Sequence, residues 1–227
     1  MVAAAHPGAH PSIGKSTPVH KRRHYCSVLS DHLEVRPASE HELALVVAAL
    51  GDGPFLAERL ARQSEDNGVL LVAWFDGDPV GCVYVWLEDA EERELREHLP
   101  GVPLLNRLKV VERWRNNGFG TKLVRIAERV AREHGRKQLA LGIALENVDA
   151  ERLYRRLHFE EWQHGLVDTY YVVFEDGNEV RAPERCRILV KDLDESTGGG
   201  RPSAPSERRS DGEELARAQS RPPGPAG

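Results

Sequence analysis

The sequence predicts a mixed α/β fold, with a central, mostly antiparallel sheet that contains one parallel strand–helix–strand unit. Two apolar runs, residues 69–75 and 80–87, flank an Asp-Gly turn and form a strong hairpin signal. A further apolar run at 104–111 leads into helical periodicity, and another at 138–145 follows it. That order favours parallel pairing through a right-handed crossover. The near-continuous apolar character of the hairpin predicts a sheet covered on both faces.

Composition limits the class of protein. The chain has 227 residues, enough for one domain of ordinary size plus tails. A net charge of −5 and a pI near 6.1 argue against a nucleic-acid partner. No run approaches the roughly 18 apolar residues that span a bilayer, so no membrane partner is expected. The N-terminus lacks the apolar core of a signal peptide.

Cysteine usage indicates a reducing compartment. The three cysteines, Cys26, Cys82 and Cys186, lie far apart and form no Cys-x-x-Cys pair. This pattern favours reduced thiols and a cytoplasmic protein over a disulfide framework. No Cys/His pair has ligand spacing, so no metal site is expected.

Changes in composition predict three regions. Residues 1–32 are rich in Ala, His, Pro, Gly and Ser and are expected to be a disordered arm. The folded domain is predicted to span 33–193. Residues 194–227, rich in Gly, Pro, Ser, Arg and Glu, are expected to be a disordered tail.

Local patterns place the elements of this domain. Ser39 and Glu42 have the spacing of a capping box that starts a first helix, and Gly51 ends it. Around the hairpin and the crossover unit, the expected elements are a strand at 33–36, a short helix from Phe55 to about Asn67, a charged helix at 88–98, a helix from Phe119 to Gly135, a helix capped by Asn147, and strands at 165–174 and 186–190 separated by a turn at 175–178.

The turn between residues 111 and 121 has the features of a phosphate-binding loop. A strand leads into Arg115-Asn116-Asn117-Gly118-Phe119-Gly120 at the start of a helix, where unpaired N–H groups and the positive helix end attract anions. The glycines allow a ligand to approach the backbone. Arg115 at a helix N-terminus is electrostatically unusual unless an anion binds there. The P-loop and dinucleotide-binding fingerprints both fit poorly, because their glycine and lysine spacings are not met.

A third kind of phosphate loop fits better. Residues 115–120 resemble the [Q/R]-x-x-G-x-[G/A] pyrophosphate loop of the GNAT family of N-acetyltransferases, which holds coenzyme A. Residues 147–154, Asn-Val-Asp-Ala-Glu-Arg-Leu-Tyr, resemble that family's N-x-x-A-x-x-L-Y motif. The order of elements also matches across the predicted domain. Glu112 stands where the family often has proline, and His158 precedes Phe159 where glycine is usual.

The resemblance implies a fold, a reaction and a set of site residues. The fold would be that of an acyl-CoA N-acyltransferase, whose parallel unit splays to hold acetyl-CoA. Its fourth strand, here with Leu108 and Val110, would contact pantetheine. Tyr154 would be catalytic and would give a proton to the departing thiolate. The remaining cofactor-binding residues would be Arg115, Asn116, Asn117, Gly118, Phe119, Gly120, Thr121 and Asn147.

Several alternatives remain open from the sequence alone. A protonated amine must lose a proton before it can attack, so a general base is expected. Strict alternation along the strand at 104–111 places Asn106, Leu108 and Val110 on one face and offers no carboxylate. Glu88 and Glu146 are therefore the candidates, and His164 fits a structural role better. Asn147 is either only a helix cap or also a cofactor contact. The acceptor is an amine of a small molecule or of a protein, and the acidic segment 88–97 weakly favours a cationic one. A non-catalytic acyl-CoA-binding module is the alternative function, and the chain is expected to be a monomer or homodimer.

Overall fold

The computed structural model describes residues 32–175 and 178–194. The arm and the tail expected from composition lie outside these residues, apart from His32 and Asp194. The described elements, in chain order, are β1 (Leu33–Pro37), η1 (Glu40–Glu42), α2 (Leu43–Leu50), α3 (Gly53–Ser64), β2 (Gly68–Phe75), β3 (Asp78–Trp86), α4 (Arg93–His98), β4 (Leu104–Val110), η2 (Glu112–Trp114), α5 (Phe119–Glu133), β5 (Gln138–Ala144), α6 (Val148–Arg156), β6 (Glu160–Glu175) and β7 (Asn178–Asp192).

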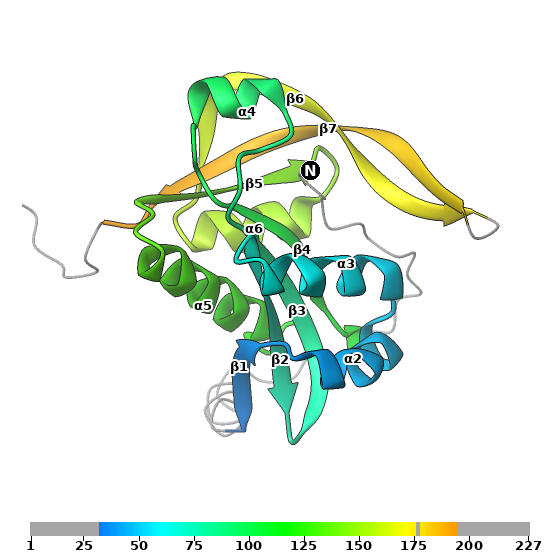
Figure 1. The fold of residues 1–227 in the computed structure, drawn as a ribbon. Coiled ribbons are helices and arrows are strands. Elements are labelled where there is room, and N and C mark those ends of the chain that lie inside the picture. The colour runs from blue at the N-terminus through cyan, green and yellow to red at the C-terminus, as the bar shows by residue number, and fades with distance from the viewer. Residues whose placement is uncertain (1–31, 176–177, 195–227) are drawn as a thin grey trace, which may run out of the picture. The chain divides into compact units, whose positions relative to one another are not determined.

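The strands form one seven-stranded sheet in the order β1-β2-β3-β4-β5-β7-β6 (Figure 1). All neighbouring strands are antiparallel except β4 and β5, which are parallel and are joined through α5. The predicted hairpin is formed by β2 and β3, and the parallel pair lies where the crossover pattern placed it. The predicted fold class is therefore confirmed.

Helices cover both faces of the sheet, as the apolar strands predict. Side chains of α2, α3 and α4 pack in a first buried cluster with one face of the sheet, and those of α5 and α6 pack in a second cluster with the other face. We call these the α3 face and the α5 face. Leu71, Val72 and Val83 are completely buried, because helices pack on both faces of the sheet.

Local chemistry explains where the first helical segment starts and ends. The Ser39 N–H donates to the Glu42 carboxylate at 3.1 Å, as in the predicted capping box, and the Ser39 hydroxyl donates to the same carboxylate at 2.6 Å. The first turn is a 3-10 turn, and α2 continues from it. Gly51 ends α2 with a φ of +72°, a conformation that glycine adopts without strain.

A β-bulge in β4 breaks the regular alternation of its side chains. Cys82 of β3 lies opposite Lys109 and Tyr84 lies opposite Asn106, so β4 contains one extra residue between these pairs. Arg107 has a φ of +57° at this point. A strict alternation would place Asn106, Leu108 and Val110 on one face, and the bulge makes that prediction wrong.

The parallel pair β4–β5 opens soon after it begins. Leu104 and Ala140 are register partners, and the Ala140 N–H also donates to the Pro103 carbonyl at 3.0 Å. Beyond this point β5 stays paired with β7 as far as Ala144, while β4 continues beside β3. The backbone edges of β4 and β5 that face each other therefore separate toward their C-terminal ends.

The last two strands are longer than the sequence indicates, and α4 is shorter. The predicted strands at 165–174 and 186–190 extend to Glu160–Glu175 and Asn178–Asp192, because their backbones pair well beyond the end of β5 (Figure 1). Polar residues and Pro183 hide this extension in the sequence. The charged segment 88–98 is helical only over Arg93–His98. In the described part of the chain, no helix is long and apolar enough to cross a membrane.

Candidate functional site

The N-terminus of α5 presents backbone N–H groups that the described residues leave unpaired. Gly118 is the N-cap, with a φ of +85°, and Asn116 also has a positive φ, of +62°. The Lys122 N–H makes the first helical hydrogen bond, to the Gly118 carbonyl at 3.0 Å. No hydrogen bond within the described residues uses the N–H groups of residues 118–121, and no acidic side chain lies in the first turn. This end of α5 is suited to an anion.

Side chains of the loop hold its shape. The Arg115 Nε donates to the Val110 carbonyl at 3.1 Å, which closes the loop onto the end of β4. The Asn117 amide donates to the carbonyls of Trp114 and Arg115, at 3.2 and 3.1 Å. The Arg115 side chain is otherwise exposed, so part of its guanidinium faces solvent.

Phe119 and Gly120 fix the start of α5 against its neighbours. The Phe119 ring is 2% exposed and packs against Trp114 and Phe75, so only its backbone is available to a ligand. A Cβ at Gly120 would lie 3.6 Å from Leu153 of α6 and 3.9 Å from Val110. The glycine therefore marks the place where α5, α6 and β4 meet. Thr121 follows in the first turn and is partly exposed.

Helix α6 contributes the two predicted residues of the second motif. The Asn147 side chain accepts a hydrogen bond from the Ala150 N–H at 3.1 Å, so its capping role is real. Tyr154 is 5% exposed on the α5 face, with its ring edge-on to Phe159. Burial raises the pKa of Tyr154 well above its usual range, so the phenol keeps its proton at neutral pH.

The bulge divides β4 between the two faces of the sheet. Leu108 and Val110 pack in the cluster on the α5 face, on the side of the loop and of Tyr154. Asn106 lies opposite Tyr84, which packs on the α3 face, so Asn106 belongs to that face. The sequence places Asn106 with Leu108 and Val110, and this is corrected by the extra residue.

A charged cluster on the α3 face is not apparent from the sequence. Arg107 and Lys109 of β4 both contact the Asp52 carboxylate, the lysine at 3.4 Å. Burial of Asp52 favours the neutral acid, but its contacts with Arg107 and Lys109 outweigh burial and keep the pKa of Asp52 below its usual value. More than 50 residues separate the partners, so no local pattern could have predicted the pairing.

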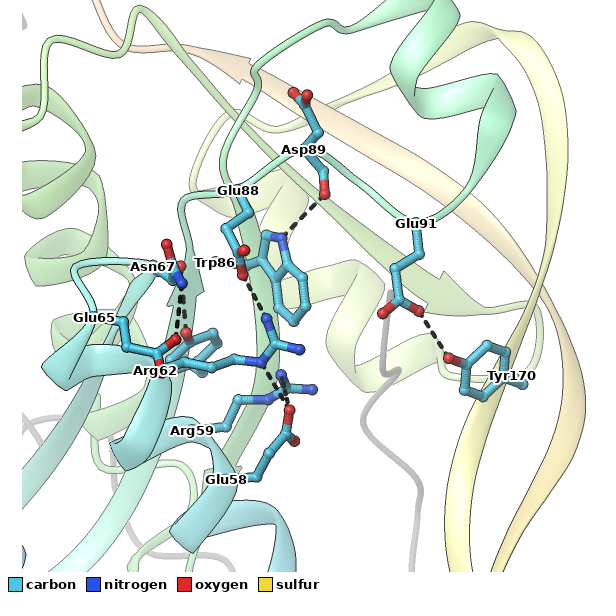
Figure 2. A network of polar contacts seen from close by, with 11 residues as sticks. Glu58, Arg59, Arg62, Glu65, Asn67, Trp86, Glu88, Asp89, Glu91 and Tyr170 are labelled. Carbon is cyan, nitrogen blue, oxygen red and sulfur yellow. Dashed lines mark hydrogen bonds and ion pairs between the residues drawn. The ribbon is translucent and has the colours of Figure 1, made fainter.

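A second polar network lines the α3 face above β3 (Figure 2). Arg59 of α3 is 1% exposed, and its guanidinium lies over the rings of Phe55, Tyr84 and Trp86 at 4.9, 5.2 and 4.8 Å. Such contacts with ring faces stabilise a buried cation.

Acidic residues of the segment before α4 complete this network. Glu88 accepts a hydrogen bond from Arg62 at 2.5 Å, and Glu91 accepts one from the Tyr170 hydroxyl at 2.8 Å (Figure 2). Glu92 accepts one from the Thr169 hydroxyl at 2.7 Å. The last two contacts attach the long β6–β7 hairpin to this segment.

The three candidate bases differ in their surroundings. Glu88 is engaged by Arg62, and Glu146 is exposed after β5. His164 stacks on His98, with ring centroids 3.7 Å apart, and also contacts Trp162, so its surroundings are those of a structural residue. Among the described residues, no group of three or more His, Cys, Asp or Glu side chains is arranged to hold a metal ion.

The fold and this site together define an acetyltransferase of the GNAT family. The model of the Acetyltransferase (GNAT) family matches residues 32–159, which is more than half of the chain, and the chain belongs to this family. The match includes β4, the loop, α5 and the motif on α6.

Known relatives agree with this assignment. The chain is 32% identical over 105 residues to an uncharacterized N-acetyltransferase of Methanocaldococcus jannaschii, and the match covers 45% of this chain and 42% of that protein. A GNAT family acetyltransferase from Elizabethkingia anophelis, solved with acetyl-CoA bound, has a similar fold: the TM-score is 0.50, the identity 17%, and the match covers 71% of this chain and 99% of that one. A ribosomal-protein-alanine N-acetyltransferase from Brucella melitensis gives a TM-score of 0.52 at 22% identity, over 70% and 99% of the two chains.

Proposed function

We propose that this chain transfers an acetyl group from acetyl-CoA to a primary amine by direct attack of the amine on the thioester. The observation that carries the proposal is the path along β4. The strand leaves β5 after Leu104 and ends at Val110, whose carbonyl accepts a hydrogen bond from Arg115 of the loop that leads to the unpaired N–H groups of α5. Tyr154 lies on the same face of the sheet as Leu108 and Val110. Family membership and the fold shared with a structure that contains acetyl-CoA support the same cofactor here.

In this proposal the pyrophosphate of acetyl-CoA binds the loop. The N–H groups of residues 118–121 donate to phosphate oxygens, and the exposed part of Arg115 adds a positive charge. Asn116 and Asn117 shape the loop, and the pantetheine arm runs along the free edge of β4 beside Leu108 and Val110. Asn147 fixes the start of α6 on the other side of the pantetheine arm.

The reaction then follows from ordinary acyl-transfer chemistry. The neutral amine attacks the thioester carbonyl carbon, a C–N bond forms, and the C–S bond breaks with its electron pair leaving on sulfur. Backbone N–H groups at the free edge of β4 stabilise the negative charge on the carbonyl oxygen. Tyr154, protonated at neutral pH, donates its phenolic hydrogen to the departing sulfur, and the amine gives its extra proton to a base or to water. The Tyr154 phenolate then takes a proton back from solvent, which restores the starting state.

The acceptor approaches from the α3 face. The protein groups that bind the acceptor include the acidic residues of the segment before α4, in keeping with a cationic amine of a small molecule or of a protein. Cys82 and Cys186 are free thiols, in keeping with a protein that works in the cytoplasm, as a monomer or homodimer.

A thiol-release assay over a panel of amines tests this function. Wild-type protein should release free CoA from acetyl-CoA in the presence of an accepted amine. Tyr154→Phe should lower kcat by about 100-fold or more, which is the usual contribution of a general acid, with unchanged affinity for acetyl-CoA. Tyr84→Phe removes an equally buried hydroxyl on the α3 face and controls for lost stability. Acetyl-CoA binding without turnover on any amine would instead identify an acyl-CoA-binding module.

A further inference from the structure

Asn106 is a fully buried polar side chain of β4. It is 0% exposed, and neither its amide nitrogen nor its amide oxygen has a hydrogen-bond partner in the described structure. Buried amides are nearly always hydrogen-bonded, because burial without a partner is unfavourable. The neighbours of Asn106 on this strand, Leu104 and Leu105, are ordinary buried leucines. The amide of Asn106 therefore has hydrogen-bonding capacity that the described residues do not use.

The position of Asn106 indicates what that partner is. It lies two residues after Leu104, the last residue of β4 that pairs with β5, and one residue before the bulge at Arg107. It is therefore at the point where the two strands separate. Its cross-strand partner Tyr84 places it on the α3 face, away from the face that carries Tyr154.

We propose that Asn106 binds the acceptor amine at the moment of attack. The side-chain oxygen accepts a hydrogen from the neutral amine, which directs the nitrogen lone pair toward the thioester carbonyl carbon, and the side-chain NH₂ donates to a second polar atom of the acceptor. A carboxamide is neutral at physiological pH, so Asn106 orients the amine and the proton leaves to another base or to water. The inference rests on the proposed function, because it needs acetyl-CoA on the opposite face.

The surroundings of Asn106 suit this role. Arg59 and the Asp52–Arg107–Lys109 cluster lie on the same face as Asn106, so this face carries charged groups that can contact polar parts of the acceptor. The bulge keeps Leu108 and Val110 turned toward the cofactor while Asn106 and Arg107 face the acceptor. One strand thus serves both substrates.

Replacement of Asn106 by leucine, which is similar in size and apolar, separates this role from a structural one. An amide that lacks a partner in the fold contributes nothing to stability, so Asn106→Leu should melt at the same temperature as wild type or higher. Affinity for acetyl-CoA, measured by calorimetry, should be unchanged. The value of kcat/KM for the amine should fall by about 100-fold, the usual loss when a positioned polar group is removed. Leu105→Met, a volume-conserving change on the α5 face of the same strand, is the matched control.

The possible results separate the two proposals. Turnover of Asn106→Leu within about threefold of wild type would overturn the role of Asn106 and leave the proposed function standing. Absence of acetyl-CoA binding by wild-type protein would overturn the proposed function itself. Asn106→Ala, which cannot clash, gives the same readout if the leucine variant does not fold. If neither variant folds, Asn106 is a structural residue and the inference is wrong.

Discussion

Gly118 provides the sharpest test of the loop, because its backbone conformation disfavours a side chain although the surrounding space would admit one. Its φ is +85°, and a Cβ there would meet nothing within 4 Å. Alanine would therefore fit sterically but would be strained. The left-handed conformation costs an alanine about 1–2 kcal/mol. For a domain of this size, each kcal/mol lowers the melting temperature by about 2–4 °C.

The same strain should also weaken binding of acetyl-CoA. A loop that relaxes toward negative φ turns its N–H groups away from the phosphates, and one hydrogen bond to a charged group contributes about 1.5–3 kcal/mol. We therefore expect Gly118→Ala to raise the Kd for acetyl-CoA about 10-fold or more. Calorimetry measures this Kd, and thermal melts without ligand measure the strain.

Gly120, in the first turn of α5, and Gly135, just beyond its C-terminal end, supply controls. Gly135, at the other end of the helix, has a φ of +70° and nothing within 4 Å, so Gly135→Ala should lose similar stability with no change in Kd. Gly120 has no positive φ, and its added Cβ would make only ordinary contacts of 3.6–3.9 Å. Gly120→Ala should therefore keep its stability without ligand. Equal Kd values for Gly118→Ala and Gly135→Ala would refute the assignment of the loop as the phosphate site.

Two further predictions concern stability. Asn147→Ala removes the oxygen that accepts the Ala150 N–H and should lower the free energy of unfolding by about 1 kcal/mol, measured as a lower denaturation midpoint. Asn147→Asp should retain the cap and the stability. Equal losses for the two variants would contradict the capping role. Hydrogen bonds from Arg36 and Ser39 lower the pKa of Glu42 to about 2, so Glu42 stabilises the fold above its unfolded pKa of about 4.3, and this contribution is lost as the pH falls from there toward 2. Melting temperatures between pH 2 and 6 should show this loss in wild type and a smaller one in Glu42→Gln, and parallel curves would argue against it.

The sequence predicts the parts of this structure that local patterns encode. The Asp-Gly turn, the capping box at Ser39 and the glycine loop each depend on a few neighbouring residues, and each is found where the pattern placed it. The elements that position Tyr154 and Asn147 follow from helical periodicity in the same way.

The acceptor side of the site could not be predicted in this way. The bulge at Arg107 has no glycine to mark it, and Asp52, which contacts Arg107 there, comes from a distant part of the chain. The attachment of Tyr170 to Glu91 also joins distant segments. Asn106 lies inside the run Leu104–Leu108, and alternation alone placed it on the wrong face.

Calorimetric titration of the full-length protein with acetyl-CoA tests the central claim most directly. The account predicts one binding site, a Kd within the usual substrate range of about 1 μM to 1 mM, and competition by CoA but not by ATP. Absence of binding, or equal competition by ATP and CoA, would contradict the claim that β4 and the N-terminus of α5 form an acetyl-CoA site.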